Sequence, residues 1–301
     1  MAASEGTTSI GFIGLGHMGG NMAARFLAAG HAVYGEERIR DDAQHLVDAG
    51  LQWRDTPREV ALASDVVFSS VPDDDVLVAV ADGPDGIISG LAPGKIWVDV
   101  STVSPKASRD VAVRVGEVGA TMLDAPVSGS VPQVEAGTLT IMVGGDEEAY
   151  RRVEPLLRVL GTPTRVGDNG QGLALKLAIN ISLAVQMLAF SEGVRLAERD
   201  GIDPKLAIEV MASSAIASPM LKARAPLMLA LPEEAWFDIS LMHKDIRLAL
   251  ALAHQRGLAL PSTDAASQVL TRAEELGYGH RDIAAIYEVV PRLTETGGGQ
   301  A

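Results

Sequence analysis

"TSIGFIGLGHMGGNMAARFLAA", residues 8–29, is the stretch that decides the fold of this 301-residue chain. Its first residues are typical of a buried strand, and residues 18–29 have the periodicity of a helix. Between them lies a G-x-G-x-x-G pattern. In that context the first glycine permits a tight turn, the second lets backbone approach a pyrophosphate, and the third allows close helix–strand packing. The helix N-terminus would face the negative charge.

The glycine turn is therefore predicted to bind a dinucleotide, with a plain strand–helix turn as the alternative. We expect His17, inside the turn, to act through its backbone rather than its imidazole. The predicted contacts are Gly14, Leu15, Gly16, His17, Met18 and Gly19.

Acidic and basic residues follow the second predicted strand. Glu37 lies near the spacing of about 20 residues at which an acid binds the adenosine ribose hydroxyls. A carboxylate there would repel a 2′-phosphate and favours NAD, whereas Arg38 and Arg40 could bind that phosphate and favour NADP. All three could also be solvated surface charges. We expect NAD as the cofactor, with NADP as the open alternative.

Strand-like and helical patterns alternate as far as about residue 166, which predicts βα units around a mostly parallel sheet. Two helix starts are marked: Thr56-Pro57, with a reciprocal Glu59, and Ser104-Pro105. Only helical patterns follow, and they cover residues 172–199, a segment opening at 204, and 219–230, 240–256, 262–276 and 282–290.

The sequence thus predicts an α/β fold with a second, helical domain. A Rossmann-type, mostly parallel sheet domain at 1–168 precedes an all-helical domain at 169–293. Residues 294–301 are expected to form a flexible tail.

Composition excludes several classes of partner and site. The net charge is −14 with no basic block, which argues against nucleic acid or an anionic membrane as the main partner. Cysteine is absent and metal ligands do not cluster, so no metal site is expected. The N-terminus lacks the pattern of a signal peptide, and the apolar stretch 177–191 is interrupted by polar residues. We therefore expect a soluble, cytoplasmic protein.

A glycine–serine loop follows a later strand in "DAPVSGSVPQVEAGTL", residues 124–139. The C-terminal ends of strands are where open α/β sheets bind ligands. Ser128, Gly129 and Ser130 offer hydroxyls and unencumbered N–H groups to a substrate carboxylate. Taken alone, the loop would more simply be a polar turn.

A lysine interrupts the apolar segment "GQGLALKLAIN", residues 170–180. Lys176 and Asn180 lie on one helix face. The helix dipole and apolar burial both disfavour an ammonium, which predicts a lowered amine pKa suited to a general acid/base near neutrality. Asn180 could orient the amine and a substrate hydroxyl together. A lysine that snorkels to the surface is the alternative, which the surrounding apolar residues disfavour.

A further lysine lies in "HKDIRLALA", residues 243–251. By its position on an amphipathic helix, Lys244 is predicted to be a solvated residue paired with Asp245.

Four blocks together resemble the β-hydroxyacid dehydrogenase family, which includes 3-hydroxyisobutyrate dehydrogenase, tartronate semialdehyde reductase and glyoxylate/succinic semialdehyde reductase. They are "GFIGLGHMGGNMA", "DAPVSGSVPQVEAGTL", "GQGLALKLAIN" and "HKDIRLALA", and the resemblance covers roughly residues 8–292. It implies a dinucleotide-binding domain, a long interdomain helix and a helical domain that builds homodimers or homotetramers.

The resemblance also implies roles for single residues. Lys176 is the catalytic acid/base and Asn180 its partner, and Ser128 and Gly129 bind the substrate carboxylate. Lys244 lies near nicotinamide and substrate, which reverses its interpretation as a surface residue. The implied contacts at the ends of two further strands are Val71 and Pro72 for the cofactor and Thr102 for cofactor and substrate.

Two positions depart from the common pattern of the family. Ser130 stands where many members have a second glycine, as in the glyoxylate/succinic semialdehyde reductase branch. That branch usually carries Asn-Arg where this chain has Glu37-Arg38. The subfamily therefore stays open.

The expected activity is that of an NAD(P)-dependent oxidoreductase. It would interconvert a small hydroxy acid and its semialdehyde or keto acid, with Lys176 as general acid/base. One alternative is an imine reductase or reductive aminase of the same architecture, a group that typically lacks this lysine. The other is a non-catalytic dinucleotide-binding regulator, against which the joint presence of Lys176, Asn180 and the Ser128 loop argues.

Overall fold

The computed structural model describes residues 8–293, which form two compact units that divide within one helix. The sheet unit ends at Lys176, and the helical unit begins at Leu177. Both residues belong to α9 (Gln171–Arg199), so these two units divide within this helix. The predicted tail at 294–301 lies outside the described residues.

The sheet unit is built on a nine-stranded, mostly parallel sheet, as predicted. Its order is β3-β2-β1-β4-β5-β6-β8-β7, with β9 paired to β8. Strand β8 runs antiparallel to β6 and β7 and parallel to β9. The strands are β1 (Ile10–Ile13), β2 (Val33–Glu36), β3 (Gln52–Trp53), β4 (Val66–Ser69), β5 (Ile96–Asp99), β6 (Thr121–Asp124), β7 (Val127–Ser128), β8 (Leu139–Gly144) and β9 (Gly161–Gly167).

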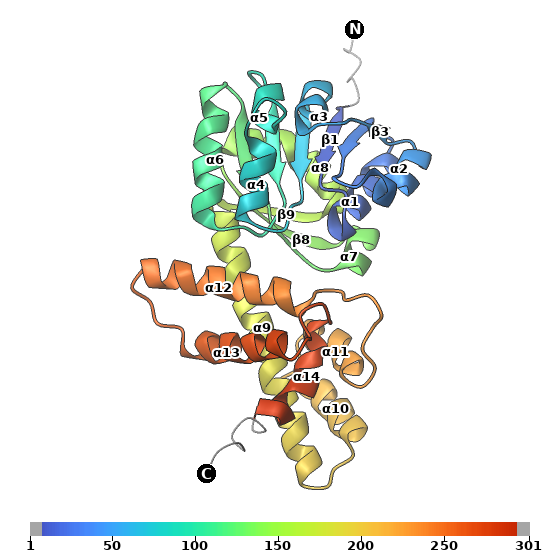
Figure 1. Cartoon of the computed structure of the whole chain (residues 1–301), viewed down its shortest axis with the longest axis vertical. Helices are drawn as coiled ribbons and strands as arrows, with labels where there is room; N and C mark the ends of the chain where they lie inside the picture. Colours follow the sequence, from blue (N-terminus) through green and yellow to red (C-terminus); the bar gives the residue numbers. More distant parts are fainter. Residues whose placement is uncertain (1–7, 294–301) are drawn as a thin grey trace. The chain divides into compact units, whose positions relative to one another are not determined.

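Helices cover both faces of this sheet (Figure 1). One face packs against α1 (His17–Ala28), α2 (Gln44–Asp48), α7 (Val131–Ala136) and α8 (Glu147–Leu160). The other packs against α3 (Pro57–Ala63), α4 (Asp74–Ala81), α5 (Ile87–Gly90) and α6 (Pro105–Glu117). A short 3₁₀ helix, η1 (Arg40–Ala43), precedes α2. Because both faces are covered, β1, β4 and β5 are buried along their whole length, as is usual for parallel strands.

The order reverses beside β1, whose neighbours are β2 and β4. At such a point the loops after adjacent strands leave in opposite directions and open a crevice for ligands at the carboxyl ends of the strands. The glycine turn follows β1, so the topology places it where a dinucleotide is expected.

Both predicted helix starts are present. The Thr56 hydroxyl accepts a hydrogen bond from Glu59 N at 3.2 Å, and the Ser104 hydroxyl accepts one from Ala107 N at 3.0 Å. The predicted reciprocal bond to Thr56 N is wrong: the Glu59 carboxylate reaches one residue further back and accepts from Asp55 N at 2.9 Å.

The helical unit packs its own core around α9. Side chains of α9 such as Met187, Phe190 and Val194 belong to this core. Further elements are α10 (Pro204–Ser213), α11 (Pro219–Arg224), η2 (Ala225–Met228), α12 (Ile239–Gln255), α13 (Pro261–Glu275), η3 (Ile283–Ala285), α14 (Ile286–Val289) and η4 (Val290–Leu293). A Rossmann-type sheet unit followed by a helical unit, with a long helix running into the second, confirms the predicted fold class.

Taken whole, α9 is long and apolar enough to cross a membrane, with a mean hydropathy of 1.8 over its most apolar window. Residues 177–191 taken alone are too short and too polar to span a bilayer, but α9 continues beyond that stretch at both ends. The same length and hydropathy are found in core helices of soluble proteins, and α9 contributes to the core of the helical unit.

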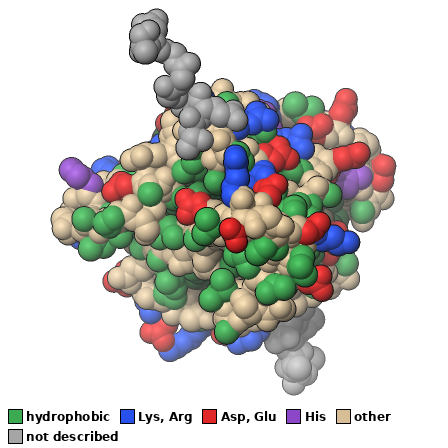
Figure 2. All heavy atoms as spheres, turned by 90° about the horizontal axis from the view of Figure 1, so that it is seen from below, with side chains coloured by type: hydrophobic (Ala, Val, Ile, Leu, Met, Phe, Trp, Pro, Cys, Tyr) green, Lys and Arg blue, Asp and Glu red, His purple; other side chains and the backbone are tan. Residues whose placement is uncertain are grey.

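Large apolar side chains are also exposed near the end of α9 and on α10. Leu196 is 74% exposed, Val210 57% and Leu206 52%. Figure 2 shows hydrophobic side chains at the surface over much of the face that it presents.

Candidate active site

The glycine turn has the geometry of a phosphate cradle. Gly14 has a φ of +81°, and a Cβ there would lie 2.2 Å from the Ser70 carbonyl oxygen. At Gly19 a Cβ would lie 2.0 Å from the Gly14 oxygen. A Cβ on Gly16, by contrast, would meet no protein atom within 4 Å. Gly14 and Gly19 are therefore required by the fold. Gly16 instead leaves open the space that a pyrophosphate would need.

Helix α1 starts at His17 directly behind this space. Its N-cap is Gly16, and no side chain caps the helix. Uncapped N–H groups at a helix N-terminus favour an anion. The turn thus fits the pyrophosphate of a dinucleotide.

Glu37 lies against the same turn. Its Oε2 accepts a hydrogen bond from Leu15 N at 2.7 Å, and its Oε1 accepts one from Arg38 N at 2.8 Å. The structure therefore brings the predicted ribose-binding acid to the glycine turn. Arg40 instead places its guanidinium over the ring of Trp53, 5.2 Å from the centroid.

Sequence reasoning missed Glu36, the residue before this acid. Burial, and then the neighbouring charge of Glu37, raise the pKa of Glu36 to about 7. A glutamate at the last position of a predicted strand was the available signal.

A second missed carboxylate, Asp99, organises the ends of β4 and β5. Its Oδ1 accepts hydrogen bonds from the Ser69 hydroxyl at 2.7 Å and the Ser101 hydroxyl at 2.6 Å. Ser101 Oγ in turn accepts from Val71 N at 2.8 Å. This chain of bonds fixes the loop after β4, which holds Val71 and Pro72, against the segment that leads into Thr102.

Asp99 is fully buried, and burial raises its pKa to about 6. Its Oδ2 has no hydrogen-bond partner among residues 8–293. The signal in the sequence was an aspartate inside the apolar strand pattern "KIWVDV".

The glycine–serine loop departs from the prediction in one detail. Gly129 has a φ of +136°, and a Cβ there would lie 2.7 Å from Leu139 Cδ2, so glycine is required. The N–H of Ser130 donates to Gln133 Oε1 at 2.8 Å as part of a capping box at the start of α7. The N–H of Ser130 is therefore already hydrogen-bonded within the loop. The prediction that this N–H is unencumbered was wrong.

Lys176 is buried, with 9% of its surface exposed, which excludes a lysine that snorkels to the surface. Asn180, one turn further along α9, is fully buried. Its Nδ2 donates to Asp245 Oδ2 at 2.5 Å, and its Oδ1 has no hydrogen-bond partner among residues 8–293. A buried acceptor without a hydrogen-bond partner, such as Asn180 Oδ1, is suited to a ligand that donates a hydrogen bond to it.

Lys244 is not a solvated residue. Its side chain is 19% exposed, and its Nζ lies 3.2 Å from Oδ1 of the buried Asp245. The pairing was predicted, but the solvated position was wrong. Asp245 itself was missed as a site residue: its carboxylate accepts from Asn180 and pairs with Lys244. It shares one stripe of α12 with the buried Met242, Ile246 and Ala249, and an acid on an apolar stripe was the signal.

Two family models match the chain and together cover almost all of it. Residues 9–170 match the NAD binding domain of 6-phosphogluconate dehydrogenase. Residues 170–290 match a model described as the NAD-binding domain of NADP-dependent 3-hydroxyisobutyrate dehydrogenase.

Named relatives are similar over most of their length. The chain is 34% identical to the chloroplastic glyoxylate/succinic semialdehyde reductase 2 of Arabidopsis thaliana, covering 95% of this chain and 80% of that protein. It is 36% identical to 2-hydroxy-3-oxopropionate reductase of Escherichia coli, with 93% and 96% covered. Among solved structures, 3-hydroxyisobutyrate dehydrogenase of Mycobacterium tuberculosis with L-serine has a TM-score of 0.83 at 28% identity, with 95% and 99% covered.

Proposed function

The chain belongs to the β-hydroxyacid dehydrogenase family, and on this premise we propose how its residues divide the work of the reaction. Members of this family interconvert small hydroxy acids and the matching semialdehydes or keto acids, so the chain is an NAD(P)-dependent oxidoreductase of this kind. When bound, the nicotinamide cofactor accepts or supplies the hydride, and the protein supplies orientation and charge.

NAD is the proposed cofactor rather than NADP. The carboxylate of Glu37 lies on the glycine turn, where it accepts from Leu15 N. A ribose with free hydroxyls can donate to a carboxylate in this place, whereas a 2′-phosphate would meet a like charge. The position of Arg40 over Trp53 supports the same choice.

The burial of Lys176 carries the proposed mechanism. A lysine is rarely buried in an apolar helix unless its amine is used, and this one lies one turn from the buried Asn180. In the oxidation direction the neutral amine of Lys176 removes the proton of the substrate hydroxyl. In the reduction direction its ammonium donates a proton to the carbonyl oxygen. Asn180 orients the substrate oxygen through its amide.

A small carboxylate is the proposed substrate. The Ser128 hydroxyl and the backbone at Gly129 would bind its carboxylate, with Thr102 and Ser130 at the edge of that site. Lys244 would supply the positive charge that draws an anion to a protein with a net charge of −14. We assign Asp245 to holding Asn180 and Lys244 in place, because it contacts both.

The proposed assembly is a homodimer or homotetramer in the cytoplasm. Exposed apolar side chains on α9 and α10, among them Leu196 and Val210, would be covered by a second copy. Light scattering at several concentrations tests the assembly, and Val210→Asp should shift it towards the monomer.

A turnover assay tests the function directly. The purified chain would be given NAD⁺ or NADP⁺ with small hydroxy acids, NADH or NADPH with the matching semialdehydes, and NADPH with cyclic imines. Turnover of hydroxy acids or semialdehydes supports the proposal. Turnover of cyclic imines alone would make the chain an imine reductase. Cofactor binding without turnover of any compound would favour a regulator.

A further inference from the structure

Helix α9 takes its N-terminal cap from a distant strand. Gly170, the residue before its first turn, has a φ of +84° and no side chain with which to cap. Asp124, at the end of β6, supplies the acceptor instead: its Oδ1 accepts from Gly170 N at 2.7 Å and its Oδ2 from Leu173 N at 3.0 Å. An N-cap side chain normally accepts from the same third position of the helix.

The carboxylate suits this place for electrostatic reasons as well. The N-terminus of a helix carries about half a positive charge, which favours an anion. Asp124 is fully buried, and this burial raises its pKa, an effect that the hydrogen bonds from Gly170 and Leu173 partly offset. The helix N–H groups are therefore what holds this carboxylate.

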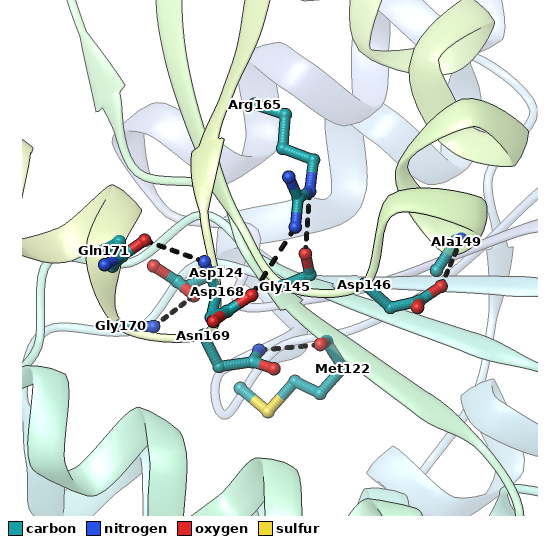
Figure 3. Close-up of polar contacts among 10 residues, drawn as sticks. All are labelled: Met122, Asp124, Gly145, Asp146, Ala149, Arg165, Asp168, Asn169, Gly170 and Gln171. Carbon is teal, nitrogen blue, oxygen red and sulfur yellow. Dashed lines mark hydrogen bonds and ion pairs between the residues drawn. The ribbon is translucent and has the colours of Figure 1, made fainter.

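Two glycines leave room for the contact. A Cβ on Gly172 would lie 2.8 Å from Asp124 Oδ2 and 2.4 Å from the Met142 oxygen, and a Cβ on Gly144 would lie 2.6 Å from Asp124 Oδ1. Nearby, Asn169 Nδ2 donates to the Met122 oxygen at 2.8 Å, as Figure 3 shows together with the bond from Gly170. The first turn of α9 is thus tied to β6 by several contacts.

Lys176 follows this tied turn directly. It lies three residues after Leu173, which places both on the same side of the helix. We propose that Asp124 is a positioning residue for the reaction: by capping α9 it fixes the first turn of the helix and, with it, the amine of Lys176. This inference rests on the proposed role of Lys176 as acid/base.

Asp124→Asn tests the proposal, because it keeps the size of the side chain but replaces one acceptor oxygen with a donor. Amide hydrogen exchange would be measured over residues 170–176 in the whole protein, together with kcat and the Kd of the cofactor. We expect faster exchange in this segment, a kcat lower by about 10- to 100-fold because the amine is misplaced, and an unchanged cofactor Kd.

Asp146 offers a matched control. Its side chain caps α8 in the same unit by accepting from Ala149 N at 2.8 Å, also drawn in Figure 3. Asp146→Asn should loosen the start of α8 and leave kcat unchanged. Equal losses of kcat in both variants would reduce Asp124 to a residue of general stability and overturn the proposal.

Gly172→Ala supplies a second variant that leaves the carboxylate intact. Alanine normally stabilises a helix relative to glycine. Here its Cβ would push the first turn away from Asp124, so exchange over 170–176 should rise and kcat should fall, again with normal cofactor binding. Normal exchange and normal kcat in this variant and in Asp124→Asn would refute the positioning role.

The exchange measurement needs no substrate, so it separates this inference from the proposed function. If both variants loosened residues 170–176 while a Lys176→Ala variant kept its turnover, the acid/base role would fail, and the positioning role that depends on it would fail too. If Lys176→Ala lost turnover but neither Asp124→Asn nor Gly172→Ala changed exchange or kcat, only the positioning role would fail.

Discussion

Asp99 and Asp124 are register partners on the neighbouring strands β5 and β6, and both are fully buried carboxylates at the carboxyl ends of their strands. Each holds a different part of the candidate site. Asp99 binds Ser101, which holds the loop at Val71, and Asp124 binds the first turn of α9. Two adjacent buried acids are costly unless hydrogen bonds satisfy them, and here those bonds organise the edge of the sheet where the ligands are expected.

The first prediction concerns turnover. Lys176→Ala should lower kcat by about 10²- to 10⁴-fold, the usual contribution of a general acid/base, and leave the cofactor Kd nearly unchanged. Steady-state kinetics and cofactor titration measure the two effects. Lys205, which is exposed on α10, gives the control substitution Lys205→Ala, for which we expect normal kinetics. A folded Lys176→Ala variant with normal kcat would remove this residue from the mechanism.

A second prediction separates two glycines of one turn. Gly16→Ala should leave the melting temperature nearly unchanged, since its Cβ meets no protein atom, but should weaken binding of the cofactor. Gly19→Ala should lower the melting temperature, because its Cβ would overlap the Gly14 oxygen. Thermal unfolding and cofactor titration of both variants would show the contrast. Equal effects on stability would mean that Gly16 serves the fold rather than the ligand.

Cofactor choice gives a third prediction. Glu37→Ala should raise KM for NAD and reduce the preference for NAD over NADP, because the carboxylate that binds ribose hydroxyls and repels a 2′-phosphate is lost. The ratio of kcat/KM for the two cofactors measures the preference. A wild-type protein with a much higher kcat/KM for NADPH than for NADH would show that Arg38 and Arg40 dominate.

The fourth prediction concerns pH and stability. The pKa of Asp99 is raised from 3.8 to about 6, so the folded state binds this proton more tightly than the unfolded state. The contribution of protonated Asp99 to the free energy of unfolding is therefore fully present below about pH 4. It is lost as pH rises from about 4 to about 6. One pKa unit corresponds to about 1.4 kcal/mol, so the loss is roughly 3 kcal/mol.

Asp99→Asn removes this titration. The unfolding free energy of wild type minus that of the variant should therefore fall by roughly 3 kcal/mol between pH 4 and pH 7. Urea unfolding at several pH values measures it, and the other carboxyl groups cancel in the difference. A difference that rose with pH, or did not change, would mean that Asp99 is ionised throughout this range in the folded protein.

Features that depend on neighbours in sequence could be predicted from the sequence. The glycine turn, the helix starts at Thr56 and Ser104, and the change from alternating patterns to helices follow from local backbone preferences and periodicity. The burial of Lys176 followed from the apolar residues around it in the helix. Lys244 was misjudged from the residues alone, because the depth to which a side chain is covered depends on what packs above its helix.

Only the tertiary structure decided which polar groups meet. The hydrogen bond between Asp124 and Gly170 joins residues 46 positions apart in the sequence. The bond between Asn180 and Asp245 joins residues 65 positions apart, and the bond between Ser101 and Val71 joins residues 30 positions apart. Each of these bonds depends on strand order, strand register or helix packing, none of which a local pattern specifies. The sequence by itself therefore determined the fold class, the cofactor turn and the lysine, while the buried carboxylates that hold them became visible only once distant segments lay side by side.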